Sequence, residues 1–151
     1  MPDANPLPSL TTASGSAPRI VYAGGSQAQA IVATVLTAEF GCCLVHLRTG
    51  EATLAYLRDH DMPDLIVIDG APADMPGAVL ARLIHAARGE DAPPVLALAD
   101  ANGQAAGDRP PFSSVLTQPF SPRDFHKAIC KSLKSAAAGA TGRADAALAH
   151  A

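Results

Sequence analysis

The sequence of 151 residues lacks the features that mark several common classes of protein. It contains no tryptophan, only 4% aromatic residues and only 17% charged residues, with a net charge of −3 at pH 7. A nucleic-acid-binding protein needs a basic surface, so this composition argues against one. The apolar runs fall well short of the roughly 20 residues that span a bilayer, and the N-terminus lacks the basic start and apolar stretch of a secretory signal. We therefore expect no nucleic-acid partner, no membrane insertion and a cytoplasmic location.

Cysteine is scarce as well, and the cysteines show neither a metal-site nor a disulfide pattern. Cys42, Cys43 and Cys130 are odd in number and have no CxxC spacing, so we expect reduced thiols in a reducing compartment. The five histidines are scattered, without the i, i+4 spacing or the cysteine partners of a metal site. No Gly-x-Ser-x-Gly turn indicates a hydrolase. The sequence thus predicts a protein that is not an enzyme.

What the sequence does contain is a regular alternation of short apolar runs with helix-like segments. The runs are RIVYA, CCLVHL, DLIVID, PVLALA and SSVLT. The central runs are continuously apolar, which is typical of parallel strands covered on both faces. The pattern predicts a doubly wound, flavodoxin-like α/β fold with a five-stranded parallel sheet and about five helices. The fourth helix, in residues 101–111, should be short or irregular because it holds two glycines and ends in two prolines.

The ends of the chain differ in composition from its middle. Residues 1–18 are rich in Pro, Ser, Thr and Ala and predict a flexible arm, and residues 136–151 form an Ala-rich tail interrupted by glycines. Residues 19–135 are expected to fold as one domain. Within it, Ser26 with Gln29 and Ser121 with Asp124 have the spacing of helix N-terminal capping boxes.

Ligands of doubly wound sheets bind beyond the carboxyl ends of the strands. The residues just after the predicted strands are therefore the candidate site: Gly24, Gly25, Asp69, Gly70, Ala99, Asp100, Gln118 and Pro119.

Three segments near these strand ends resemble the receiver domain of bacterial two-component response regulators. PDLIVIDGAPADMPG is similar to the third strand of that family, its phosphoacceptor aspartate and the following loop, with Asp69 at the acceptor position. TGEATLAYL is similar to the second helix, and VLTQPFSPRDF to the fifth strand, the Lys-Pro-Phe turn and the last helix. The resemblance covers about residues 19–135 and implies the receiver fold.

The resemblance also implies that the phosphorylation machinery is incomplete. The acid pair of the family is matched by Gly24 and Gly25, its hydroxyl residue by Ala99 and its lysine by Gln118. Mg²⁺ usually requires one or two carboxylates beside the phosphate, and phosphoryl transfer depends on neutralising the charge of the phosphoryl oxygens. We therefore expect a degenerate receiver in which Asp69 is inactive and Mg²⁺ binds weakly or not at all.

A carboxylate with no metal or cation beside it gains little from such a site, so we also expect Asp69→Ala to be tolerated. The alternative is an unconventional receiver that is phosphorylated on Asp69, with Asp100 as a second carboxylate.

Gly24 and Gly25 allow two interpretations. The Gly24–Ser26 amides at a helix N-terminus could hold an anion, although the segment lacks the GxGxxG and GxxxxGK[ST] spacings. Alternatively, two glycines stand in place of two acids because no metal has to be bound. We favour the second interpretation.

The last predicted helix carries a basic face. Its residues are Arg123, Lys127, Lys131 and Lys134, and Val115 stands where receivers have their switching aromatic residue. In receivers, the surface of the fourth helix, fifth strand and fifth helix is where partners dock. The sequence thus favours a stand-alone, phosphorylation-independent protein-interaction module, an adaptor or competitor for a histidine kinase, a phosphotransfer protein or another regulator. No DNA-binding output domain is expected after residue 135. A nucleotide sensor that uses the vacated strand-end pocket is a further alternative.

Overall fold

A computed structural model describes residues 9–11, 15–60, 62–69, 74–88, 93–99, 114–117 and 120–134. Its five parallel strands form one sheet in the order β2-β1-β3-β4-β5. The strands are β1 (Arg19–Ala23), β2 (Cys43–Leu47), β3 (Leu65–Asp69), β4 (Val95–Ala99) and β5 (Ser114–Thr117). Each coincides with a predicted apolar run, and the order is that of a flavodoxin-like sheet. The predicted fold class is confirmed.

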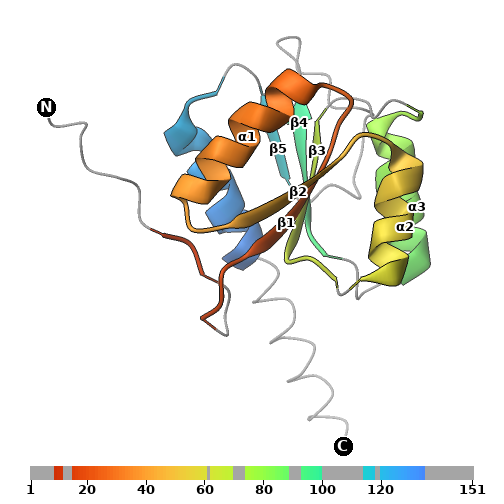
Figure 1. Cartoon of the computed structure of the whole chain (residues 1–151), viewed down its shortest axis with the longest axis horizontal. Helices are drawn as coiled ribbons and strands as arrows, with labels where there is room; N and C mark the ends of the chain where they lie inside the picture. Colours follow the sequence, from red (N-terminus) through yellow and green to blue (C-terminus); the bar gives the residue numbers. More distant parts are fainter. Residues whose placement is uncertain are drawn as a thin grey trace, which may run out of the picture.

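The helices cover both faces of this sheet. They are α1 (Gln27–Glu39), α2 (Gly50–Asp59), α3 (Gly77–Arg88) and a last helix over residues 122–134. Figure 1 shows α1 and the blue last helix on one face of the sheet, and α2 and α3 on the other. The predicted fourth helix and the C-terminal tail lie outside the described residues. None of the helices in the described ranges combines the length and apolarity that a membrane span requires.

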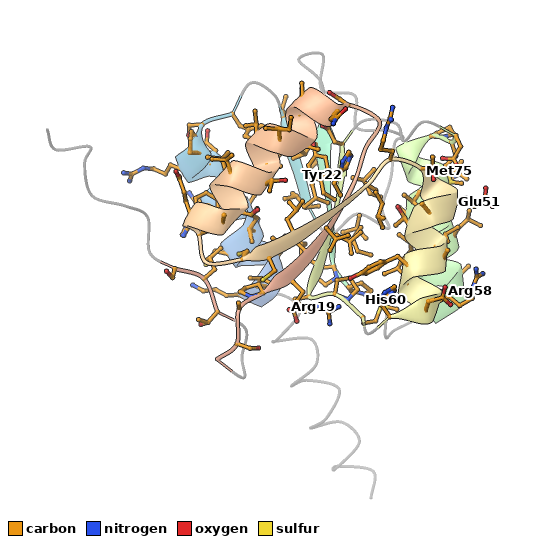
Figure 2. The ribbon with its side chains drawn as sticks, in the orientation of Figure 1. Arg19, Tyr22, Glu51, Arg58, His60 and Met75 are labelled. Atoms are coloured by element: carbon orange, nitrogen blue, oxygen red, sulfur yellow. The ribbon has the colours of Figure 1, made fainter. Side chains whose placement is uncertain are left out.

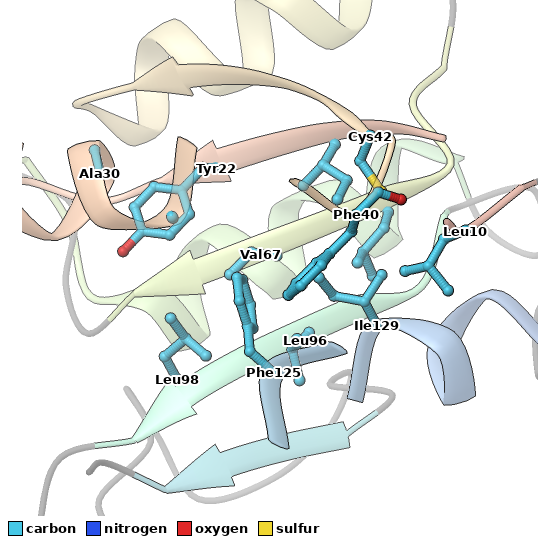
Figure 3. Close-up of a cluster of buried hydrophobic side chains, with 13 residues drawn as sticks. Leu10, Tyr22, Ala30, Phe40, Cys42, Val67, Leu96, Leu98, Phe125 and Ile129 are labelled. Atoms are coloured by element: carbon cyan, nitrogen blue, oxygen red, sulfur yellow. The ribbon is translucent and has the colours of Figure 1, made fainter. Parts of the chain in front are cut away.

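Two buried clusters result, because alternate residues of a strand point to opposite faces of the sheet. Tyr22 and Val67 belong to the cluster under α1 and the last helix, together with Phe125 (Figure 3). Val21 and Ile68 belong to the cluster under α2 and α3. On α3, Leu80 and Ile84 are buried in the second cluster, whereas Leu83 is 41% exposed.

The N-terminal arm contributes one residue to the first cluster. Leu10 is buried, and its backbone N–H donates a hydrogen bond to the carbonyl of Phe40 over 2.7 Å. The predicted domain boundary at residue 19 therefore leaves out one residue of the core. Leu10 lies in a stretch rich in proline and serine that has no hydrophobic periodicity, so the sequence did not reveal this contact.

Both predicted capping boxes have a local hydrogen bond of the expected kind. The Ser26 hydroxyl accepts from the backbone N–H of Gln29 over 3.3 Å. Ser121 and Asp124 form a reciprocal pair, with bonds of 3.1 Å and 3.2 Å between side chain and backbone. The last helix therefore begins at a well-defined point, which fixes the direction of its exposed face.

The N-terminus of α2 is capped by a residue from a distant loop, which the sequence did not reveal. The Asp74 carboxylate accepts from the backbone N–H of Gly50 over 2.6 Å and from that of Glu51 over 3.0 Å. Figure 2 shows the neighbouring Met75 and Glu51 at the same end of α2. These hydrogen bonds lower the pKa of Asp74, the bond from Gly50 having the larger effect. Asp74, just before α3, is thereby attached to the N-terminus of α2.

Asp74→Ala should lower the melting temperature near pH 7, because two helix amides lose a charged acceptor. The pKa of Asp74 is lower in the folded protein, so this contribution is present above the unfolded carboxyl pKa of about 3.9 and is lost as pH falls through the folded value. Thermal unfolding followed by circular dichroism should show the difference at pH 7 and a smaller one below about pH 4. The control is Asp59→Ala, which removes an exposed carboxylate from the C-terminal end of α2. A difference that does not depend on pH would contradict the capping role.

Candidate functional site

The carboxyl ends of β1 and β3 bring the predicted site residues together. β1 and β3 pair in parallel with Ala23 opposite Ile68, so Gly24 follows β1 beside Asp69 at the end of β3. A Cβ atom on Gly24 would lie only 3.1 Å from the Cβ of Asp69. Ala99 ends β4 and pairs with Thr117 of β5. Gly24, Gly25 and Asp69 are thus neighbours at this edge, whereas Asp100 and Gln118 lie outside the described residues.

A residue that the sequence analysis did not consider completes the site. The Tyr22 hydroxyl donates a hydrogen bond to the Oδ2 atom of Asp69. Tyr22 is only 1% exposed, and Figure 3 shows its ring lying along β1 with the hydroxyl at the carboxyl end of the sheet. The sequence predicted no metal or cation beside Asp69, and it did not reveal this phenol donor. The candidate residues all lie at or after the strand ends, whereas Tyr22 lies inside β1, two residues before Gly24.

The side chain of Tyr22 explains why residue 24 is a glycine. Besides its approach to Asp69, a Cβ atom at this position would lie 3.3 Å from the Cε1 atom of the Tyr22 ring. Both contacts are tighter than ordinary van der Waals distances, so any side chain would require the ring or Asp69 to move. This crowding gives a physical reason for a glycine in place of an acid at residue 24, because the Tyr22 ring occupies part of the space that a side chain would need.

The backbone of Gly24 is held by β2 and is not free to bind an anion. Its N–H donates to the carbonyl of Leu47 over 3.1 Å, and its carbonyl accepts from the Nε2 atom of His46 over 2.8 Å. The His46 ring also meets the Tyr22 ring edge-on, with centroids 5.7 Å apart. The first of the three Gly24–Ser26 amides is therefore already hydrogen-bonded within the sheet, which argues against an anion held by all three.

The electrostatics of the site keep the tyrosine protonated. Burial raises the pKa of Tyr22, and the hydrogen bond to Asp69 and the negative charge of that carboxylate raise it further. The raised pKa of Tyr22 therefore leaves the phenol protonated, and a hydrogen-bond donor, at neutral pH. One oxygen of Asp69 is engaged by this donor, and Gly24 and Gly25 supply no side-chain oxygen.

These residues do not fit a bound Mg²⁺ ion. The described part of the chain contains no cluster of three or more histidine, cysteine or acidic residues that could hold a metal. Among the described residues, a divalent ion at this edge would find the Asp69 carboxylate alone, already hydrogen-bonded to a phenol, where magnesium usually requires one or two carboxylates beside a phosphate.

Comparisons with known proteins identify the architecture. No family model and no curated protein matches the sequence. Among solved structures, the chain is similar to the N-terminal domain of a response regulator/sensory box/GGDEF protein from Carboxydothermus hydrogenoformans, with a TM-score of 0.72 and 20% identity over 81% of this chain and 98% of that one. It is also similar to the signal receiver domain of a histidine kinase from Syntrophus aciditrophicus (TM-score 0.66, 22% identity, 79% and 92% covered).

A third similar structure is the chemotaxis response regulator CheY4 of Vibrio cholerae, with a TM-score of 0.65 and 17% identity over 78% of this chain and 99% of that one. The chain has the receiver fold. At these identities the likeness establishes the fold alone. In the receiver fold, the Tyr22–Asp69 hydrogen bond lies where the resemblance in sequence places the phosphoacceptor.

Tyr22→Phe should destabilise the protein by about 1–2 kcal/mol, because the half-buried Asp69 carboxylate loses its donor. Asp69→Ala, which the sequence predicted to be tolerated, should also destabilise the protein because it leaves a buried phenol without its acceptor, and the two changes together should cost less than their sum. Urea unfolding of the two single variants and the double variant measures this coupling.

Tyr56→Phe removes a phenol hydroxyl from α2 beside His60 and serves as the control, with an expected change within about 0.5 kcal/mol. Additive effects of Tyr22→Phe and Asp69→Ala would show that the hydrogen bond contributes nothing to stability.

Proposed function

We propose that this chain is a degenerate receiver that acts by binding another protein, independently of phosphorylation, as an adaptor or competitor in bacterial two-component signalling. The proposed partner is a histidine kinase, a phosphotransfer protein or another regulator in the cytoplasm. The module itself catalyses no reaction. The observation that carries the proposal is the hydrogen bond between Tyr22 and Asp69.

This hydrogen bond supports the proposal, because it engages one oxygen of Asp69 with a neutral donor. A phosphoryl group on Asp69 would need cations around its oxygens, whereas the group next to Asp69 is a buried, protonated phenol. Loss of a single preorganised electrostatic partner commonly costs about 2.7–4 kcal/mol of transition-state stabilisation. Here both metal-binding acids are glycines, and Tyr22 would also have to be displaced. The same tyrosine fills space beside Gly24, which counts against a nucleotide bound in a vacated pocket.

The face that we propose for recognition lies on the last helix. Arg123, Lys127, Lys131 and Lys134, hereafter the basic strip, are all exposed. The opposite side of this helix is fixed in the core by Phe125 and Ile129, which are fully buried. Val115, on the edge strand β5, is 50% exposed. A rigid helix with an outward basic strip fits an acidic surface on a partner, since complementary charges favour encounter and orientation.

Incubation with a small phosphodonor and Mg²⁺ should leave the intact mass unchanged. The amide chemical shifts of Gly24, Gly25 and Asp69 should not move at low millimolar Mg²⁺, because Asp69 is engaged and the glycines bring no oxygen side chains. As a matched positive control, Tyr22→Val combined with Gly24→Asp and Gly25→Asp supplies both acids and removes the ring that crowds residue 24. That variant should show saturable, Mg²⁺-dependent shifts. Saturable shifts in the unaltered protein, or a phosphorylated Asp69, would support the alternative of an unconventional receiver.

Reversing charge at Lys127 and Lys131 should weaken binding to the native partner by about tenfold or more. Exposed charges contribute little to folding, so the unfolding free energy should stay nearly constant. The partner would be captured from the native lysate and its affinity measured with purified proteins.

The control carries Arg58→Glu and Arg82→Glu, which make the same change in charge at exposed positions on α2 and α3, on the other face of the sheet (Arg58 in Figure 2). Equal losses for the two pairs, or no loss at Lys127 and Lys131, would place the interface elsewhere.

A further inference from the structure

The outward side of α1 is apolar. Ile31, Val32 and Val35 are 59%, 58% and 54% exposed, which exceeds the exposure of the other large apolar side chains in the described residues. With the exposed Ala28 they occupy positions i, i+3, i+4 and i+7, and so form one continuous strip along the helix. We call Ala28, Ile31, Val32 and Val35 the α1 strip. Figure 1 shows α1 packed on one face of the sheet, and the exposure of these side chains places the strip on the side of the helix away from that sheet.

Neither the core nor the helix itself accounts for these side chains. The inward face of α1 is formed by the buried residues Ala30, Ala33 and Thr37. Valine and isoleucine have lower helix propensity than alanine, lysine or glutamate, so they do not stabilise an exposed helix surface. Exposed strips of this kind usually mark surfaces that bind another protein.

The charge of α1 indicates which partner covers the strip. Glu39 is the only charged residue of α1, and it stands at the C-terminal end, where the helix dipole disfavours a negative charge. The first turn has no acidic residue, and the last turn has no basic one. An anion in this helix is therefore at the wrong end for its own dipole. It would be favourably placed at the N-terminal end of a second α1 helix that runs in the opposite direction.

We propose that the α1 strip is the interface with a second copy of this chain, packed with the two α1 helices antiparallel about a twofold axis. With the axis level with the midpoint between Ala33 and Thr34, Val32 faces Val35 of the second copy, and Ala28 faces Glu39 of the second copy. The methyl group of Ala28 leaves room for that carboxylate beside the first-turn amides. A parallel pair would instead place the two Glu39 side chains together.

The antiparallel arrangement is self-complementary, as a twofold interface requires. The α1 strip together with Glu39 spans the twelve residues from Ala28 to Glu39, or about 16 Å of helix. A helix pair of this length buries less surface than a standard interface, which buries about 1,200–2,000 Å². The dimer should therefore be weak, with a Kd of about 10 µM to 1 mM. The interface does not depend on the proposed function, because it uses neither Asp69 nor the basic strip.

Sedimentation equilibrium of the full chain from about 10 µM to about 1 mM tests the proposal. The unaltered chain should shift from monomer to dimer with concentration. Val32→Ser combined with Val35→Ser should be monomeric throughout, with unchanged helix content, since serine and valine have similar helix propensity. Val79→Ser combined with Leu83→Ser, at exposed apolar positions on α3, is the matched control and should dimerise like the unaltered chain.

A charge exchange identifies the orientation of the two helices. Glu39→Lys should weaken the dimer by about tenfold, and adding Ala28→Glu should restore it by recreating the pair with reversed sign. Both substitutions suit the dipole of their own helix, so a loss of dimer cannot be attributed to unfolding. A chain that stays monomeric at every concentration overturns the proposal. So does a dimer that the α1 variants leave intact, or one that Glu39→Lys does not weaken.

Discussion

The arrangement of the carboxyl edge depends on one hydrogen bond, from Tyr22 to Asp69. A buried phenol must have an acceptor, since an unsatisfied hydroxyl in the core costs about 1–3 kcal/mol. Asp69 supplies that acceptor, and its charge helps to keep the phenol protonated. The ring in turn lies against residue 24, where a side chain would be crowded. Tyr22, Gly24 and Asp69 therefore depend on one another, so a change to any one of them alters the requirements on the other two.

Most of the fold could be predicted from the sequence because its signals are local. Continuous apolar runs identified all five strands. Ser26 indicated the start of α1, and Ser121 indicated the start of the last helix. The features that were missed depend on contacts distant in sequence. Asp74 caps amides 24 and 23 residues away, and Tyr22 bonds a carboxylate 47 residues away. Tyr22 carried one usable signal, since a tyrosine inside an aliphatic strand must find a partner for its hydroxyl.

The chain around the acceptor position is fixed on both sides of residues 70–73, which lie outside the described residues. On one side Asp69 is bonded to Tyr22, and on the other Asp74 is bonded to the N-terminus of α2. Beside the second attachment, the side chain of Met75 packs closely on Gly50, where any side chain would collide with it. A switch requires an element with two arrangements that a ligand can bias. Attachments at Asp69 and Asp74 favour a single arrangement, which is what the proposed phosphorylation-independent module requires.

The two proposed recognition surfaces share one layer of the molecule. Phe40, at the end of α1, meets both Phe125 and His126 of the last helix, with ring centroids 6.2 Å and 4.9 Å apart. Pairing of two α1 strips would therefore bring the layers that carry the two basic strips toward each other. Like charges on neighbouring subunits repel, which limits the affinity of the dimer. An acidic partner would neutralise them, so partner binding and dimer formation should favour each other, and this reciprocity follows from thermodynamic linkage.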